Sequence, residues 1–446
     1  MTASQLIPSC RREYQSASDY LRVFSAWDHS RTEDLQFRKL QAVWKDCVAD
    51  VPYYAELVAH DEAPNEIKSW PDFYAIPELT RSHLQDHPEK FQRLSGAPDL
   101  SRMTGGSTGN PIHLGIWNSE DRILKILKLA LWIRAGYQLD SKLFLIWGHS
   151  HLLGTGWRRH LRHLQRKAKD RLLGYRRMDA YRLNPDICRS MAREFLSFRP
   201  TGLIGYASAL DYFVRSTPEV SESFLKCGCR FVQPCSELPP KPDSRDLLRR
   251  TFNCKLIEEF GGVDFGQVAM RFEEEPFEVF SDHYVVETQK TSTGATEEET
   301  VLVTTLYPRY TPLIRYRQGD AVEEIEKLPH GHMIRFGKLV GRCHDMVALD
   351  SGSSVHSMAF FHCIHQETSV LNIQLVLENQ GARLRLVTNS SYDQTAEQRI
   401  RQRLGQVAPE LAGCIFEPVD DVETSRAGKR RWVVDKRTTP PTGDTE

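Results

Sequence analysis

A short run of glycines and hydroxyl residues is the first candidate for chemistry in this chain. It consists of Thr104, Gly105, Gly106, Ser107, Thr108 and Gly109. Such clusters are commonly surface turns, but a loop with little side-chain bulk also exposes backbone N–H groups that can hold a phosphate. The Gly-Lys-Ser/Thr ending of a Walker A loop is missing. Taken alone, the run fits either a turn or a phosphate loop without a lysine.

The residues that follow the run predict a hairpin. Ile112, Leu114 and Ile116 alternate with less apolar neighbours, which is the period of a strand. The stretch Asn118 to Asp121 then supplies capping side chains and first-turn acids for a helix. We therefore expect the run to join two strands, with a helix beginning only after the second strand.

Other stretches with chemical potential follow in order along the chain. They are Ser236-Glu237-Leu238, Phe260-Gly261-Gly262-Val263-Asp264-Phe265, Pro312 to Asp320, Val340 to Met346 and Arg426-Ala427-Gly428-Lys429. Each also fits a purely structural interpretation: Asp320 follows Gly319 as a turn acid would, and Lys429 stands near a polar tail.

In this order the stretches resemble the adenylate-forming superfamily of acyl-CoA synthetases, luciferases and peptide-synthetase adenylation domains. Within it the chain is most similar to the phenylacetate-CoA ligase and CapK-like branch, over about residues 50 to 435. Three more stretches carry this resemblance: Val51-Pro52-Tyr53-Tyr54, Ile76-Pro77-Glu78-Leu79-Thr80-Arg81 and Gly205-Tyr206-Ala207-Ser208-Ala209-Leu210.

The resemblance implies an ATP- and Mg²⁺-dependent ligase that activates a carboxylic acid as an acyl adenylate and releases pyrophosphate. The acyl group then passes to an acceptor, most commonly the thiol of CoA. An amine, a hydroxyl or a carrier-protein thiol is an alternative acceptor, and a catalytically silent nucleotide-binding relative is an alternative function. Such chemistry depends on positioning and fixed positive charge rather than on an acid, a base or a covalent nucleophile of the protein.

Roles in nucleotide binding follow from the same resemblance. Residues 104 to 109 match the loop that holds the phosphates of ATP, Asp320 the acid on the ribose, and Asp264 the metal ligand. Arg342 matches an arginine on the ribose and phosphate, and Lys429 a mobile lysine on the reacting phosphate. The segments that enclose adenine are matched by Ser236, Glu237, Leu238, Phe260, Gly261 and Gly262.

The resemblance further places the acyl pocket and the hinge. The expected pocket residues are Tyr206, Ala207, Val263 and Phe265, and the expected hinge residue is His344. A largely apolar pocket with an aromatic wall favours an aromatic or medium-chain acid over acetate.

The chain departs from the pattern of the family in two places. The usual Ser/Thr-Glu pair is replaced by Val263-Asp264, and Asp is one methylene shorter although it can bind Mg²⁺. Asn110 and Pro111 stand where a lysine is often found. A zinc site is not expected, because the cysteine spacing matches no standard four-ligand framework, as seen at Cys227, Cys229, Cys235 and Cys254.

The expected architecture is α/β. The patterns predict a helix from about Thr32 to Val51, buried strands at Leu143–Trp147, Leu203–Ala207 and Leu256–Phe260, and alternating strands from Glu278 to Asp320 that include Leu313–Tyr316. With the resemblance, we expect a large N-terminal domain (1–342) of stacked α/β layers plus a small β-barrel. A mobile α+β lid (343–436) and a disordered tail (437–446) would follow.

Charge and hydropathy limit the partners. The chain has 58 Lys and Arg residues and 59 Asp and Glu residues, which gives a net charge of −1. The protein as a whole therefore does not attract nucleic acid electrostatically, and a charged partner would have to bind a local charged surface. We see no secretory signal and no apolar run long enough for a membrane span, so a cytoplasmic protein is expected. The oligomeric state stays open.

The segment Trp157 to Arg177 is the local exception, with nine Lys or Arg residues and one acid. A solvated helix face is one interpretation of such a run. A docking patch for a phosphate-bearing acceptor, a carrier protein or a membrane surface is the other.

Overall fold

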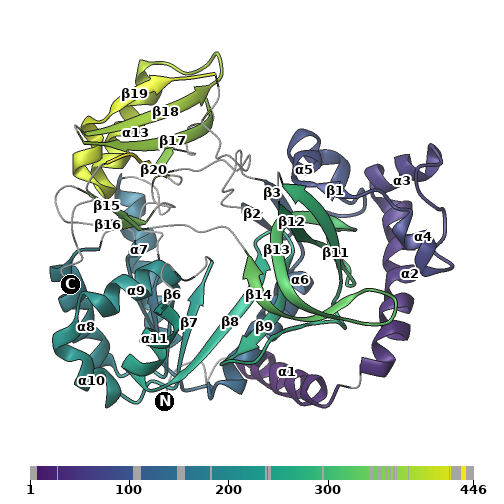
Figure 1. The fold of residues 1–446 in the computed structure, drawn as a ribbon, viewed down its shortest axis with the longest axis horizontal. Coiled ribbons are helices and arrows are strands. Elements are labelled where there is room, and N and C mark those ends of the chain that lie inside the picture. Colours follow the sequence, from purple (N-terminus) through teal and green to yellow (C-terminus); the bar gives the residue numbers. More distant parts are fainter. Residues whose placement is uncertain are drawn as a thin grey trace.

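The computed structural model describes most of the 446 residues. These are residues 8–27, 29–103, 112–147, 156–180, 183–236, 239, 243–293, 296–340, 346–349, 354–356, 360, 363–364, 367, 369–379, 381–420, 422 and 433–437. Within them, twelve strands form one large sheet, and three smaller sheets and the helices surround it (Figure 1). The mixed α/β class expected from the sequence is confirmed.

The helices have the following bounds: α1 (Pro8–Ser25), α2 (Thr32–Asp50), α3 (Pro52–Ala59), α4 (Trp70–Tyr74), α5 (Arg81–Asp86), α6 (Asn118–Arg134), α7 (Gly156–Leu172), α8 (Pro185–Phe198), α9 (Ala207–Arg215), α10 (Ser221–Leu225), α11 (Ser244–Phe252) and α13 (Gln394–Val407). Local signals fix several of these ends. Asn184 accepts a hydrogen bond from the N–H of Ile187 at the start of α8, and Pro52 separates α2 from α3.

One half of the large sheet is parallel. Its strands are β4 (Leu143–Ile146), β5 (Tyr175–Met178), β6 (Gly202–Tyr206), β7 (Phe231–Cys235) and the first part of β8 (Lys255–Gly262), in the order β5-β4-β6-β7-β8. Every residue of β4, β6 and β7 is buried. Short apolar runs of this kind suit strands that are covered on both faces. The strands predicted at Leu143–Trp147, Leu203–Ala207 and Leu256–Phe260 are confirmed as β4, β6 and β8, although β8 is only partly buried.

The other half is antiparallel and continues from β8 through a tight turn. It contains β9 (Gly266–Phe272), β10 (Phe277–Val279), β11 (Tyr284–Thr293), β12 (Thr296–Thr305), β13 (Tyr316–Lys327) and β14 (Met333–Val340), with β1 (Leu79–Thr80) beside β13. The strand expected at Leu313–Tyr316 is wrong, because β13 begins only at Tyr316. Arg315 has a φ of 50°, which an extended strand does not allow.

The remaining strands form small sheets. They are β2 (Leu100–Met103) with β3 (His113–Ile116), β15 (Met346–Ala348) with β16 (Ser354–His356), and a C-terminal sheet of β17 (Val370–Glu378), β18 (Gly381–Thr388), β19 (Ile415–Pro418) and β20 (Val433–Asp435). Helix α13 accompanies this C-terminal sheet, which lies above the large sheet in the view of Figure 1. The domain boundaries and the mobility of the lid stay predictions.

None of the described helices combines the length and the apolar character that a membrane crossing demands.

The packing of the parallel half predicts a mutational effect at Gly202 in β6. A Cβ added there would lie 2.3 Å from Cζ of the buried Phe231 ring. Gly202→Ala should therefore lower the free energy of unfolding by about 1–3 kcal/mol, measured by urea denaturation. Gly413→Ala is the control, since a Cβ there meets nothing within 4 Å. Equal stability of the two variants would contradict the packing described here.

Candidate active site

The glycine-rich run lies between the two strands of a small hairpin. β2 and β3 are antiparallel, with Leu100 opposite Ile116 and Met103 opposite His113. Helix α6 then begins at Asn118. The strand–loop–strand arrangement predicted from the flanks is confirmed. Residues 104–109 themselves lie outside the described residues, so their role as a phosphate loop stays a prediction.

The hairpin is tied to its surroundings by side chains. Arg102 of β2 forms an ion pair with Asp121 in the first turn of α6, at 2.5 Å. The Thr311 hydroxyl donates to the carbonyl of Gly115 at 3.2 Å. A Cβ on Gly115 would lie 2.5 Å from the ring of Tyr310, so only glycine allows this close approach. The ends of the loop are therefore held at defined positions.

A buried ion pair connects the start of α6 to the segment before β13. Nε of Arg309 donates to Oε2 of Glu120 at 3.0 Å, and their side chains are only 3% and 1% exposed. The other carboxylate oxygen of Glu120 accepts from the N–H groups of Trp117 and Tyr310, at 2.9 and 2.7 Å. Burial opposes the charge of Arg309, but Tyr307 and Glu120 outweigh it and raise the pKa of the guanidinium.

The same arginine reaches the turn that follows β8. Nη2 of Arg309 donates to the main-chain oxygen of Asp264 at 2.6 Å. A second anchor is the hydroxyl of Tyr284, which donates to the carbonyl of Phe265 at 3.0 Å. The turn Val263-Asp264-Phe265 is thus fixed by groups that come from remote parts of the chain.

Two glycines before this turn are required by close contacts. A Cβ on Gly261 would lie 2.3 Å from the carbonyl oxygen of Gly266, and one on Gly262 would lie 2.5 Å from Oδ1 of Asp264. The β8–β9 register also shifts between Phe260 and Gly261. Such a bulge changes the direction of a strand and is common beside functional sites.

Asp264, the predicted metal ligand, is a buried residue at the tip of this turn. Its Oδ2 accepts a hydrogen bond from the Tyr316 hydroxyl at 2.8 Å, and the residue is 7% exposed. Among the described residues, no cluster of three or more His, Cys, Asp or Glu side chains could hold a metal ion. Because Mg²⁺ is often bound by one or two carboxylates together with phosphates and water, the Asp264 carboxylate fits Mg²⁺ that arrives with a nucleotide, and this role stays a prediction.

Ser236 and Asp320, which the sequence predicts to bind the nucleotide, both lie where the backbone is irregular. Ser236 follows β7 and has a φ of 71°, a left-handed conformation that is uncommon for serine. Asp320 lies in β13, where the pairing with β12 shifts from Leu302–Arg317 to Thr300–Ala321. Both irregularities favour a functional interpretation, while the contacts of these residues with a nucleotide stay predictions.

The expected acyl-pocket residues do not all pack together. Tyr206 ends β6, and its ring stacks on Trp147 with centroids 4.6 Å apart. Phe265 packs in a different cluster, against Phe260 and Tyr316. Ala207 is buried, and Val263 is 46% exposed. Trp147 packs against both clusters and so connects them. The assignment of the acyl pocket stays a prediction, and we add Trp147 to its expected lining.

Sequence reasoning missed Trp147 and two polar residues beside the same strand ends. Gln267 stands opposite Gly261 and is 7% exposed, yet neither Nε2 nor Oε1 has a hydrogen-bond partner among the described residues. The charge of Glu259 raises the pKa of half-buried Lys128 in α6. Trp147 could have been noticed as a wall residue because it ends the predicted strand Leu143–Trp147, whereas Gln267 and Lys128 carry no local sequence signal.

The other predicted site residues cannot be placed. Glu237, Leu238, Arg342, His344 and Lys429 all lie outside the described residues. Their roles stay predictions.

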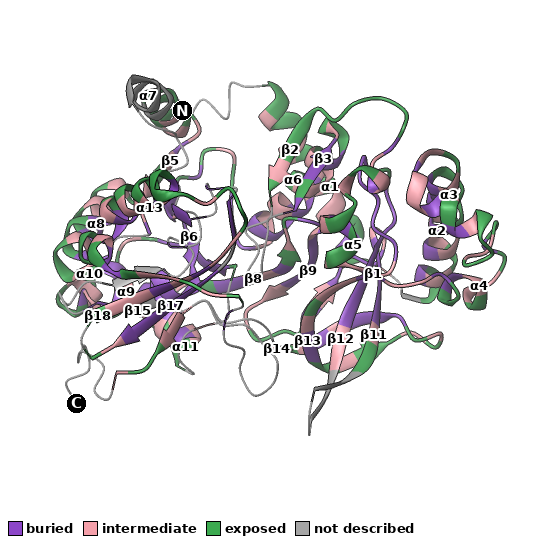
Figure 2. Cartoon of the chain, turned by 90° about the horizontal axis from the view of Figure 1, so that it is seen from above, coloured by how far each residue is buried: buried purple, intermediate pink, exposed green. Residues whose placement is uncertain are grey.

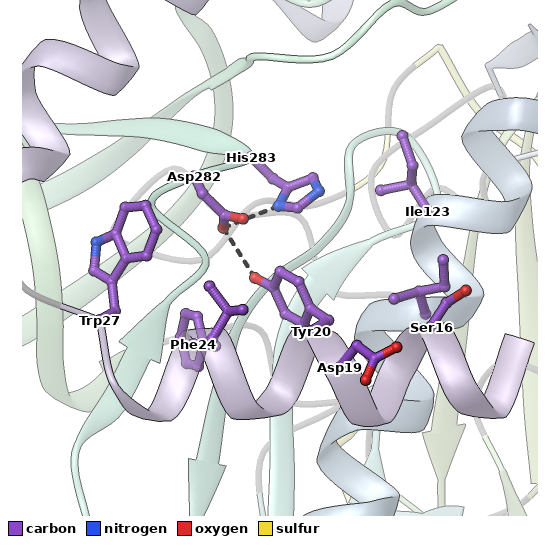
Figure 3. Close-up of a pocket in the computed structure, with 10 residues that line it drawn as sticks. Ser16, Asp19, Tyr20, Phe24, Trp27, Ile123, Asp282 and His283 are labelled. Carbon is purple, nitrogen blue, oxygen red and sulfur yellow. Dashed lines mark hydrogen bonds and ion pairs between the residues drawn. The ribbon is translucent and has the colours of Figure 1, made fainter.

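A cavity of about 360 Å³ lies elsewhere, between α1 and α6 (Figure 3). The Tyr20 hydroxyl donates to Asp282 at 2.9 Å, and Nδ1 of His283 lies 2.9 Å from the same carboxylate. The cavity is also lined by the polar side chains of Ser16 and Asp19 and by the apolar side chains of Val23, Phe24, Trp27, Ile123 and Ile126. None of the lining residues belongs to the stretches predicted to bind substrate, so we do not include the cavity in the candidate site.

The Glu120–Arg309 pair yields a testable prediction. Glu120→Gln leaves the Arg309 charge buried without its counter-charge, so the free energy of unfolding should fall by about 3–5 kcal/mol, measured by urea denaturation. Glu56→Gln is the control, since Glu56 is 47% exposed in its ion pair with Lys90 and should matter by no more than ~1 kcal/mol. Similar losses in both variants would show that the buried pair has no special role.

Comparison with known proteins gives a weak sequence match and a consistent structural match. No family model matches the chain. "Protein CapK" of Staphylococcus aureus is 20% identical over 415 residues, which cover 90% of this chain and 88% of CapK.

The structural similarity spans nearly the whole chain. A 2-hydroxyisobutyryl-CoA ligase in complex with 2-HIB-AMP and CoA superposes with a TM-score of 0.56 at 16% identity, covering 92% of this chain and 91% of the ligase. The same ligase in its postadenylation state gives a TM-score of 0.55 at 16% identity, covering 91% and 90%. This chain therefore has the fold of the adenylate-forming ligases, as its motifs predicted.

Proposed function

We propose that this protein activates a carboxylic acid with ATP to form an acyl adenylate and pyrophosphate, and then transfers the acyl group to the thiol of CoA. One observation carries the proposal: the fold extends over nine-tenths of a ligase whose structure holds an acyl adenylate and CoA. The glycine-edged turn at Asp264, the hairpin around 104–109 and the irregular positions of Ser236 and Asp320 agree with it.

The first half-reaction joins two negatively charged groups. A carboxylate oxygen attacks the α-phosphorus, the bond to the β-phosphate oxygen breaks, and pyrophosphate leaves. Backbone N–H groups and hydroxyls of residues 104–109 would hold the phosphates, and Asp320 the ribose. Arg342 and Lys429 would offset the charge that builds on the α-phosphate. Mg²⁺, bound by Asp264 and the phosphates of ATP, would neutralise further phosphate charge.

In the second half-reaction the acceptor sulfur attacks the acyl carbonyl carbon, and AMP leaves with the bonding electrons. In the proposed sequence the C-terminal lid rotates about His344 between the two steps and so exchanges Lys429 for other groups. The cytoplasm contains CoA and ATP and keeps free cysteines reduced, so we place the reaction there.

The acid that we propose is aromatic or of medium chain length. The stacked rings of Tyr206 and Trp147 and the exposed side chain of Val263 favour an apolar wall. A polar contribution would come from Lys128, half-buried near Glu259. An amine, a hydroxyl or a carrier-protein thiol would use the same adenylate, so these acceptors belong to the same proposal as alternatives.

A second candidate function is nucleotide binding without catalysis. It is favoured by the replacement of the usual glutamate by Asp264, whose Oδ2 is already hydrogen-bonded to Tyr316. Isotope exchange between ATP and pyrophosphate, measured over a library of carboxylic acids, separates the two functions. Exchange with any acid supports the ligase, and ATP binding without exchange across the library supports the silent relative. Exchange with short polar acids alone would contradict the apolar pocket.

Lys429 separates the two half-reactions. Lys429→Ala should slow adenylate formation by about 10²- to 10³-fold, the usual effect of losing one charge-stabilising donor. Acyl transfer from a chemically prepared adenylate should remain close to that of the parent protein, because the rotated lid no longer presents this residue. Lys338→Ala, at a lysine whose side chain is 62% exposed, is the control. Equal loss in both half-reactions would instead indicate general damage to the lid.

The metal role of Asp264 can be separated from its structural role. Asp264→Asn keeps the size of the side chain and an oxygen for Tyr316, but it removes the charge that would attract Mg²⁺. We expect the Mg²⁺ concentration for half-maximal exchange to rise by about tenfold or more. Tyr316→Phe removes only the hydrogen bond and should leave this concentration much less changed. If neither variant alters the Mg²⁺ dependence, another ligand holds the metal.

A further inference from the structure

Helix α7 has no task in the proposed reaction. It lies in the connection between β4 and β5, which are parallel neighbours in the sheet. A helix in such a connection ordinarily packs an apolar face onto the sheet. In the part of α7 whose side chains are described, Leu164 is instead 63% exposed and Leu172 is 49% exposed.

The exposed apolar residues of α7 share one face. Leu164, Ala168 and Leu172 follow each other at intervals of four residues, so they form a stripe along the helix, and all three are exposed. In the sequence, Leu161 lies three residues before Leu164, and Trp157 lies four residues before Leu161. An apolar stripe on an otherwise strongly charged helix is typical of helices that lie in the interface of a bilayer.

Positive charge surrounds the stripe. Lys167, Lys169 and Arg171 are exposed residues of α7. The single acid of the helix, Asp170, forms an ion pair with Arg177 of β5 at 3.3 Å. Burial and the neighbouring charge of Arg177 lower the pKa of Arg166. The segment 157–177 thus carries nine Lys or Arg residues against one acid in a chain whose net charge is −1.

The position of α7 leaves this surface accessible. In Figure 2 the described end of α7 lies at the margin of the molecule, next to β5 and away from the antiparallel half of the sheet.

We propose that α7 docks the protein on an anionic lipid surface, with Leu164, Ala168 and Leu172 inserted among the acyl chains and the Lys and Arg residues on the lipid headgroups. Two complementary features favour this occupant: the charge attracts anionic headgroups, and the stripe needs an apolar medium that headgroups alone do not offer. A second copy of the chain would place the same positive charges opposite one another, which is unfavourable.

The test is co-sedimentation of the full chain with vesicles of phosphatidylcholine, with and without phosphatidylglycerol. We expect binding only to the anionic vesicles, and weaker binding as salt is added. Lys167→Gln combined with Lys169→Gln should weaken binding by about fivefold for each charge removed. Leu164→Gln combined with Leu172→Gln should weaken it by more than about tenfold.

Matched control variants make the result specific to α7. Lys68→Gln with Lys338→Gln removes two lysines whose side chains are 78% and 62% exposed. Leu94→Gln with Leu225→Gln removes two leucines that are 75% and 48% exposed. Both control pairs should bind vesicles like the parent protein. Because all eight positions are at the surface, urea denaturation should show nearly unchanged stability.

Three outcomes would overturn the proposal. They are absence of binding to anionic vesicles, equal binding to neutral vesicles, and equal effects of the α7 and control pairs. Salt-dependent binding to soluble polyglutamate that the lysine pair weakens and the leucine pair does not, without vesicle binding, would assign α7 to an acidic protein partner instead. The readout is lipid binding, so it does not depend on the ligase activity proposed above.

Discussion

The buried contact between Glu120 and Arg309 is the constraint on which the candidate site depends. The two residues are 189 positions apart, and both are almost fully buried. Two charges in such surroundings are stable only when each has its partner, because an unpaired buried charge is strongly destabilising. Glu120 lies in the first turn of α6, which follows the hairpin that carries 104–109, and Arg309 binds the main chain of the Asp264 turn. The pair therefore fixes the hairpin, the helix and the turn relative to one another.

This framework also explains why unpartnered polar atoms near it are informative. Most buried polar groups in proteins have a hydrogen-bond partner. Among the described residues, Nη1 of Arg309, Nε2 of Gln233 and both amide atoms of Gln267 are buried without one. Arg309 and Gln267 adjoin the Asp264 turn, and Gln233 lies in β7. Since the backbone there is held by several anchors, these atoms would gain partners more readily from a bound ligand than from a rearrangement of the protein.

Sequence patterns predicted the elements that depend on local residues, and missed what depends on remote ones. The buried strands near Leu143, Leu203 and Leu256 were visible because short apolar runs are a local signal. The strand expected at Leu313–Tyr316 failed because Arg315 turns aside to bind Glu287, with Nη2 at 3.0 Å from Oε1. No spacing announces such a contact across 28 positions.

Asp264 and Asp320 could likewise be recognised from the sequence as candidate site residues, but the residues that contact them could not be predicted. The hydrogen bond from Tyr316 to Asp264 spans 52 positions and joins the turn after β8 to the first residue of β13. Asp320 lies four residues further along that strand, at the shift in register. The predicted metal ligand and the predicted ribose acid are thus connected through one short piece of backbone. The surroundings of both acids therefore depend on residues 316 to 320 at the start of β13.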